Sequence, residues 1–151
     1  MRLISRTFST HPFKILGIQQ IALGHLDKVV LRKFWCIILG IPRVGSYYSK
    51  FDNVNQDILR IGEGENAVEL HLMQPVDPRS YPNIQDNAFH HFALWVDNLE
   101  ECYQYLEGQG SQMTPGGIRK NTSGLGVIFA NPKVTGGILL ELVQHPDYLK
   151  K

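Results

Sequence analysis

Four polar residues stand in strand-like stretches that are otherwise largely apolar: Gln20, Glu69, His91 and Glu141. Two carboxylates, one imidazole and one amide oxygen are donor groups with which proteins hold divalent cations. Their spacing is regular, since His91 lies 71 positions after Gln20 and Glu141 lies 72 positions after Glu69. A shared offset of this kind indicates two similar halves, each of which contributes two of the four residues.

Strand alternation predicts where these side chains point. Because successive strand residues face opposite sides, Glu69 shares a face with His71, and the valine and leucines of 68–72 share the other. The same alternation turns His91 and Glu141 toward the face of Glu69. A carboxylate in a semi-enclosed apolar space is costly unless it is paired or metal-bound, so the pattern predicts a cation site. The ordinary alternative places each residue at a solvated strand end, but the matched offsets favour convergence.

The elements that must position these residues occur in an order that is repeated. The patterns predict, in chain order, strand 15–23, helix 27–39 capped by Asp27, strands 56–61 and 67–72, a proline-rich linker 75–82, strand 89–96, a helix from Asn98 to about 106, and strands 127–129 and 138–143. Asn98 lies 71 positions after Asp27, and Gly40 and Gly110 suit the ends of the two helices.

The repeated order predicts an α+β fold with two tandem βαβββ modules, 15–74 and 88–145, in a single domain 15–145 followed by a tail 146–151. With only two repeats, the economical packing is a pair of small mixed sheets that curve toward each other with the helices outside. Together they form a curved mixed sheet around a metal-binding cleft.

Composition excludes several classes of function. A chain of 151 residues with 43% hydrophobic residues suits one well-filled core, and 15 basic against 14 acidic residues give no electrostatic footprint of a nucleic-acid binder. The apolar runs are too short to span a bilayer. The two cysteines, Cys36 and Cys102, form no CxxC pair, which argues against a disulfide framework or structural zinc site and favours a reducing compartment.

The first fourteen residues are rich in arginine and hydroxyl side chains, and no acidic residue occurs before Asp27. This composition is typical of a mitochondrial transit peptide and predicts a location on the matrix side. An ordinary, slightly basic N-terminal arm is the alternative interpretation of residues 1–14.

The segment 89–98, FHHFALWVDN, resembles the methylmalonyl-CoA epimerases of the glyoxalase, or vicinal-oxygen-chelate, superfamily. The likeness spans about 15–144 and continues in three further segments, 127–133, 136–137 and 140–142. It implies that Gln20, Glu69, His91 and Glu141 occupy the four metal-ligand positions. Epimerases usually have histidine where Gln20 stands, whereas animal glyoxalase I has glutamine there. One nitrogen and three oxygen donors suit six-coordinate Co²⁺, Mn²⁺ or Ni²⁺ better than tetrahedral Zn²⁺.

The resemblance also implies metal-dependent epimerisation of methylmalonyl-CoA, by removal of the proton beside the thioester carbonyl of an acyl-CoA substrate. Such a reaction needs bases on both faces of the carbon. One is the glutamate matching Glu141; the other position carries Phe51, with Asp52 next to it as the candidate. Two alternatives remain open, namely a non-catalytic structural subunit of a larger mitochondrial assembly and a glyoxalase I-type lyase.

Helix 27–39 carries more apolar residues than the inner face of one helix needs. Positions expected to face outward include Val29, Cys36 and Ile37. This excess predicts that the helix and the N-terminal arm are covered by another polypeptide, either in a homodimer or in a larger mitochondrial assembly.

Overall fold

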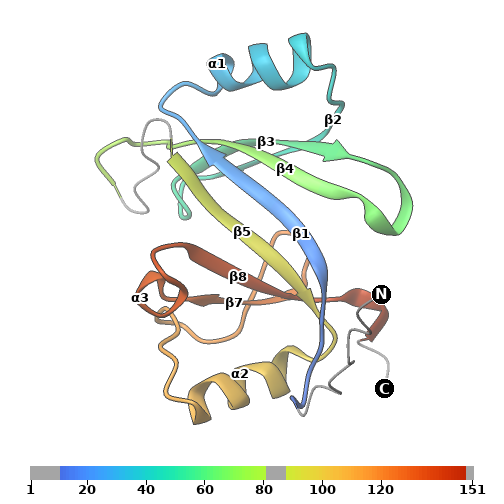
Figure 1. The fold of residues 1–151 in the computed structure, drawn as a ribbon. Helices are drawn as coiled ribbons and strands as arrows, with labels where there is room; N and C mark the ends of the chain where they lie inside the picture. The colour runs from blue at the N-terminus through green and yellow to red at the C-terminus, as the bar shows by residue number, and fades with distance from the viewer. Residues whose placement is uncertain (1–10, 81–87, 149–151) are drawn as a thin grey trace, which may run out of the picture.

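The computed structural model describes residues 11–80 and 88–148, in which eight strands form one sheet (Figure 1). The strands are β1 (Ile15–Gly24), β2 (Arg43–Ser49), β3 (Val54–Ile61), β4 (Val68–Gln74), β5 (Ala88–Val96), β6 (Arg119–Lys120), β7 (Gly126–Ala130) and β8 (Leu139–Gln144). The helical elements are α1 (Lys28–Arg32), η1 (Lys33–Ile38), η2 (Gly64–Asn66), α2 (Leu99–Gly108), α3 (Pro132–Thr135) and η3 (Pro146–Tyr148). The targeting or arm segment 1–14 lies mostly outside the described residues.

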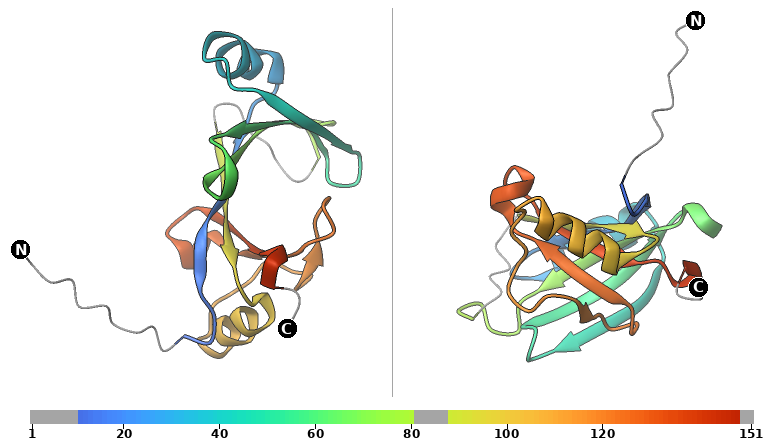
Figure 2. Two further views of the ribbon diagram at one scale, coloured as in Figure 1. Left: turned by 90° about the vertical axis from the view of Figure 1, so that its right-hand side faces the viewer. Right: turned by 90° about the horizontal axis from the view of Figure 1, so that it is seen from below.

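The sheet order β2-β3-β4-β1-β5-β8-β7-β6 places one half of the chain on each side of a central pair. β1 pairs in parallel with β4, β5 pairs in parallel with β8, and β1 and β5 pair antiparallel to each other. The two predicted βαβββ modules are thus confirmed as the two halves of a curled sheet (Figure 2). The two small sheets expected from the sequence are joined through the β1–β5 pair into one.

Each half packs its outer sheet face beneath a helix, as strand alternation predicts. In the N-terminal half, buried Leu59, Leu70 and Leu72 contact Leu31 and Trp35 of the α1/η1 segment. In the C-terminal half the corresponding cluster lies beneath α2 and consists of Val96, Leu99, Cys102, Ile128 and Leu142. The polar residues of β4 and β8 therefore face the concave side of the sheet.

The first helix begins as predicted but changes its winding. Asp27 caps it by accepting a hydrogen bond from the Val29 amide at 2.9 Å, and Gly40 follows it with φ +71°. From Lys33 onward the helix is a π-helix, in which the Leu39 amide donates to the carbonyl five residues earlier. A π-turn holds more residues than an α-turn. Consequently Cys36 packs against the inner cluster, and its predicted outward position was wrong.

A buried carboxylate fixes this helix to the sheet. Asp57 of β3 is fully buried and binds Lys28 Nζ at 3.3 Å, Arg32 Nε at 2.9 Å and Arg43 Nε at 3.1 Å. Burial alone would raise the pKa of Asp57, but the hydrogen bonds and charges of Arg32 and Lys28 outweigh it and lower the pKa. None of the helices in the described ranges is long and apolar enough to cross a membrane.

Candidate metal and proton-transfer site

Sheet register brings the predicted site residues into one row. Gln20 of β1 pairs with Glu69 of β4 on one side and with Ala93 of β5 on the other, and Ala93 pairs with Glu141 of β8. Paired residues in neighbouring strands point to the same face of a sheet. His91 lies two residues before Ala93 and shares that face. Both halves of the chain therefore contribute polar side chains to the middle of the concave surface.

A β-bulge adds one more amide to this surface. The β1–β5 register shifts between Ile18 and Gln20, so Gln19 is the extra residue, and both glutamines are buried. Bulges re-aim side chains in this way. Gln19 Nε2 donates to Glu69 Oε2 at 3.3 Å, whereas Gln20 Nε2 donates to Glu141 Oε2 at 3.2 Å.

Gln20, His91 and Glu141, here called the trio, come together below the surface, with exposures of 8%, 6% and 5%. Gln20 Nε2 lies 2.9 Å from His91 Nε2, and His91 Nε2 lies 3.3 Å from Glu141 Oε2. Since the Gln20 amide nitrogen can only donate, His91 Nε2 accepts its hydrogen bond through a lone pair. The ring proton is then on Nδ1, which lies 2.6 Å from Nδ1 of His90.

The neighbouring His90 ring supports a proton on Nδ1 of His91. Burial, and secondarily the neighbouring His91, lower the pKa of His90 to about 4, so its ring is neutral at neutral pH. A neutral ring offers an acceptor nitrogen to the Nδ1 proton of His91. Metal-binding imidazoles are commonly oriented by such an outer hydrogen-bond partner. His90 thus belongs to the site, although sequence reasoning did not single it out.

The trio fits a divalent cation in spacing and in donor type. The three atoms that face one another are Gln20 Nε2, His91 Nε2 and Glu141 Oε2, and the distances between them are 2.9, 3.2 and 3.3 Å. Two adjacent ligands at about 2.1 Å from an octahedral ion are about 3.0 Å apart, which is close to these values. His91 and Glu141 already present lone pairs. Gln20 would have to rotate its amide to present oxygen instead of nitrogen.

The fourth predicted ligand, Glu69, lies in a neighbouring cluster. Its Oε2 accepts from His71 Nε2 at 2.8 Å, and Gln56 Nε2 lies 3.3 Å from His71 Nδ1. The His71 hydrogen bond is the main reason that the pKa of Glu69 is lowered. Among the described residues, no hydrogen bond joins the Glu69 side chain to the trio, although Glu69 is the strand neighbour of Gln20. Within 11–80 and 88–148, no three His, Cys, Asp or Glu side chains are grouped closely enough to hold a metal ion.

The second-base position lies in the turn between β2 and β3. Phe51 is 96% exposed there. The carboxylate of Asp52 accepts a hydrogen bond from the Tyr47 hydroxyl at 2.7 Å, and the Tyr47 ring packs against Val54 and Met73 at the concave side. Asp52 is thus tied to the rim of the concave surface and makes no hydrogen bond to the trio.

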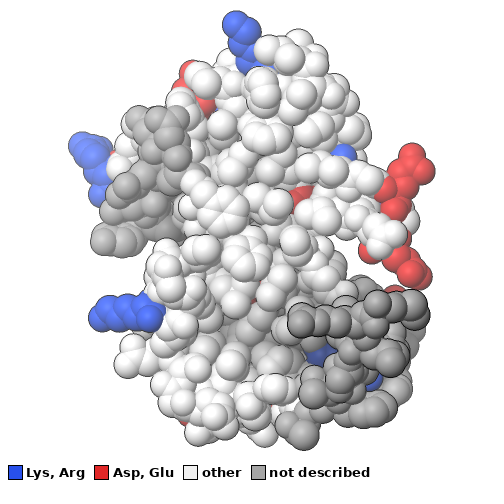
Figure 3. Space-filling view, in the orientation of Figure 1, with Lys and Arg blue, Asp and Glu red and all other residues white. Residues whose placement is uncertain are grey.

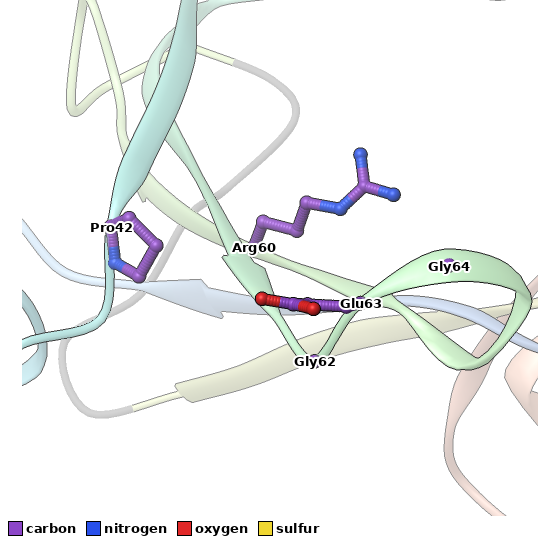
Figure 4. A pocket seen from close by; sticks show the side chains of 5 residues that line it. All are labelled: Pro42, Arg60, Gly62, Glu63 and Gly64. Atoms are coloured by element: carbon purple, nitrogen blue, oxygen red, sulfur yellow. The ribbon is translucent and has the colours of Figure 1, made fainter.

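A cleft of about 470 Å³ borders the concave surface on the Glu69 side. Its lining includes Gln19, Glu69, Arg60 and Trp95. A second pocket, of about 350 Å³, lies beyond Arg60 at the β3–β4 turn (Figure 4). There the side chains of Arg60 and Glu63 point apart, so this pocket offers no converging set of polar groups.

Paired βαβββ modules that share a polar concave surface define a tandem-module fold of the glyoxalase type. A sequence model of the Glyoxalase/Bleomycin resistance protein/Dioxygenase superfamily matches residues 19–129, and the chain belongs to this superfamily. The match includes Gln20, Glu69 and His91 and ends before Glu141.

Solved structures of the same fold include methylmalonyl-CoA epimerases. The enzyme from Mycobacterium tuberculosis superposes with a TM-score of 0.76 at 22% identity, over 94% of this chain and 95% of that one. A Streptomyces coelicolor epimerase in complex with 2-nitronate-propionyl-CoA gives 0.75 at 19% identity, over 88% and 99%. The uncharacterised protein YqjC of Bacillus subtilis is 26% identical over 117 residues, or 75% of this chain and 81% of YqjC. At these identities, the structural likeness shows the fold.

Proposed function

We propose that the chain is a divalent-metal-dependent enzyme that moves the proton beside an acyl-CoA carbonyl, with methylmalonyl-CoA epimerisation as its reaction. The observation that carries the proposal is the trio, in which a glutamine, a histidine and a glutamate from both modules converge within 3.3 Å on the concave surface. The epimerase structures of the same fold support the choice of substrate.

His91 and Glu141 would hold the metal ion, with Gln20 as the third ligand through its amide oxygen. Glu69 would become the fourth by exchanging its His71 partner for the ion, since its side chain is 42% exposed and can move. The donor set of one nitrogen and three oxygens favours Co²⁺, Mn²⁺ or Ni²⁺ over Zn²⁺. When bound, the ion supplies a positive charge that stabilises the enolate oxygen.

Glu141 would exchange a proton with the substrate carbon. Its carboxylate has one hydrogen bond from the Gln20 amide and faces His91, so a free lone pair remains for the proton. The near-complete burial of the trio excludes bulk water and strengthens each electrostatic contact there. Asp52 would serve as the second base only after the β2–β3 turn releases it from Tyr47.

An epimerase assay on metal-reconstituted protein tests the proposal. We expect conversion of one methylmalonyl-CoA epimer into the other that depends on Co²⁺ and is lost in Glu141→Gln. Protein that binds the metal and the thioester but neither inverts nor exchanges the proton would contradict it. The adduct of methylglyoxal and glutathione serves as the comparison substrate, because turnover of that adduct alone would identify a glyoxalase I-type lyase.

The second-base position favours a second candidate function. Phe51 points into solvent and Asp52 is bound to Tyr47, so one of the two bases expected of an epimerase is not in place. A non-catalytic subunit of a larger mitochondrial assembly would show this loss. Such a subunit would show no turnover and would migrate with a large complex in mitochondrial extract. The mitochondrial location itself is a prediction from residues 1–14.

A further inference from the structure

The first helix has its charges on the inside. Lys28 and Arg32 reach inward to the buried Asp57, whereas the outward side chains are almost entirely apolar. A helix that covers a sheet ordinarily shows the opposite polarity. The outward set, here called the α1/η1 face, is at least 48% exposed at every position and consists of Val29, Val30, Phe34, Ile37, Ile38 and Leu39.

The α1/η1 face is large and prominent. At roughly 100 Å² for each side chain, its six members present about 600 Å², at the upper limit of the largest apolar patch on a typical monomer. The helix lies across one end of the molecule, outside the sheet (Figures 1 and 2). The space-filling view shows this end as a largely uncharged surface (Figure 3). The face is therefore a protruding ridge.

Charge indicates what would cover this ridge. Four cations lie on or beside the first helix, Lys28, Arg32, Lys33 and Arg43, against two carboxylates, Asp27 at its N-terminus and the buried Asp57. Asp57 offsets only part of the charge of its three partners. A second copy docked through the same face would bring like charges together, which is unfavourable. The surface that complements this ridge is anionic around an apolar interior.

We propose that the α1/η1 face binds the surface of an anionic lipid bilayer, with the helix lying in the interfacial plane. Bulky apolar side chains on one face with lysine and arginine beside them are the features by which helices bind at that interface. A bilayer accommodates a convex ridge without needing a matching groove. Lys33, which lies among the apolar residues in sequence, can extend its ammonium group to the lipid phosphates.

Sedimentation with vesicles tests the proposal on the full chain. We expect binding to phosphatidylcholine vesicles that contain about 30% phosphatidylserine, and much weaker binding to phosphatidylcholine alone. Ile37→Asp should lower the partition coefficient at least about tenfold, and Lys33→Glu about tenfold. Ile37 is 73% exposed, so its replacement removes little packing, which circular dichroism can verify.

Val134→Asp is the matched control, because Val134 is also exposed but lies on α3 in the other half. It should bind vesicles like the unchanged protein, and all variants share the same N-terminal segment. Equal binding by Ile37→Asp and the unchanged protein would overturn the proposal, as would no binding to anionic vesicles. A dimer in analytical ultracentrifugation that Ile37→Asp dissociates, without vesicle binding, would instead assign the face to a second copy.

Discussion

Replacement of Asp57 by asparagine should loosen the first helix from the sheet. The substitution keeps the shape of the side chain but removes the negative charge that three cations share. Breaking a buried ion pair costs about 3–5 kcal/mol, whereas an exposed pair contributes at most about 1 kcal/mol. Because Arg32 and Arg43 are 39% and 47% exposed, we expect a loss of about 2–3 kcal/mol in the free energy of unfolding.

Urea unfolding measures this loss. With an m-value of about 2 kcal/mol per molar urea, the midpoint should fall by about 1–1.5 M at pH 7. The pKa of Asp57 is lowered in the folded state, so its contribution is complete above the unfolded pKa of about 3.9 and is lost as pH falls through the folded pKa. The difference between the two proteins should therefore shrink in acid. Asp52→Asn, at an exposed carboxylate, is the control and should change the urea midpoint little. An equally small change in Asp57→Asn at pH 7 would refute the reasoning.

Three further predictions concern the site and the assembly. His91→Ala should weaken Co²⁺ or Mn²⁺ binding at least about tenfold in calorimetry, because it removes the only nitrogen donor among the four expected ligands. His145→Ala, the control, should leave metal binding unchanged. Absence of metal binding by the unchanged protein would refute this prediction. Phe51→Glu should raise the rate at which the substrate carbon is inverted relative to the rate of proton exchange. If the unchanged protein instead inverts the carbon fast, and Asp52→Ala abolishes this activity, then Asp52 is already the second base. If another polypeptide covers the first helix, as its apolar excess predicts, the chain should migrate above 17.1 kDa on a native gel of mitochondrial extract, near twice that size as a homodimer or with a large complex. A free monomer would exclude both.

The sequence predicted those features that depend on local periodicity. The equal spacing of Gln20 to His91 and of Asp27 to Asn98 anticipated two modules, and alternation anticipated which side of β4 and β8 faces the concave surface. These features were accessible because strand parity and helix capping act over a few residues. The register of β1 against β4 and β5 then brings the two halves together.

Contacts between distant side chains were harder to predict. Glu69 shares its face with His71 in any strand, so their hydrogen bond was open to prediction from parity. The hydrogen bond from Gln19 to Glu69 was not, because Gln19 is the extra residue of a bulge in β1. The convergence of three cations on Asp57 depends on the docking of α1 against β3 and has no local signal. The π-helical turn that brings Cys36 inward has none either.

The most direct test of the metal and proton-transfer site is deuterium incorporation into methylmalonyl-CoA in D₂O. Exchange requires the trio and one base, so it does not depend on Asp52. We predict that Co²⁺-loaded protein incorporates deuterium at the carbon beside the thioester carbonyl and that Glu141→Gln, with metal still bound, does not. Metal-loaded protein that binds the thioester and leaves that proton unexchanged would contradict the account.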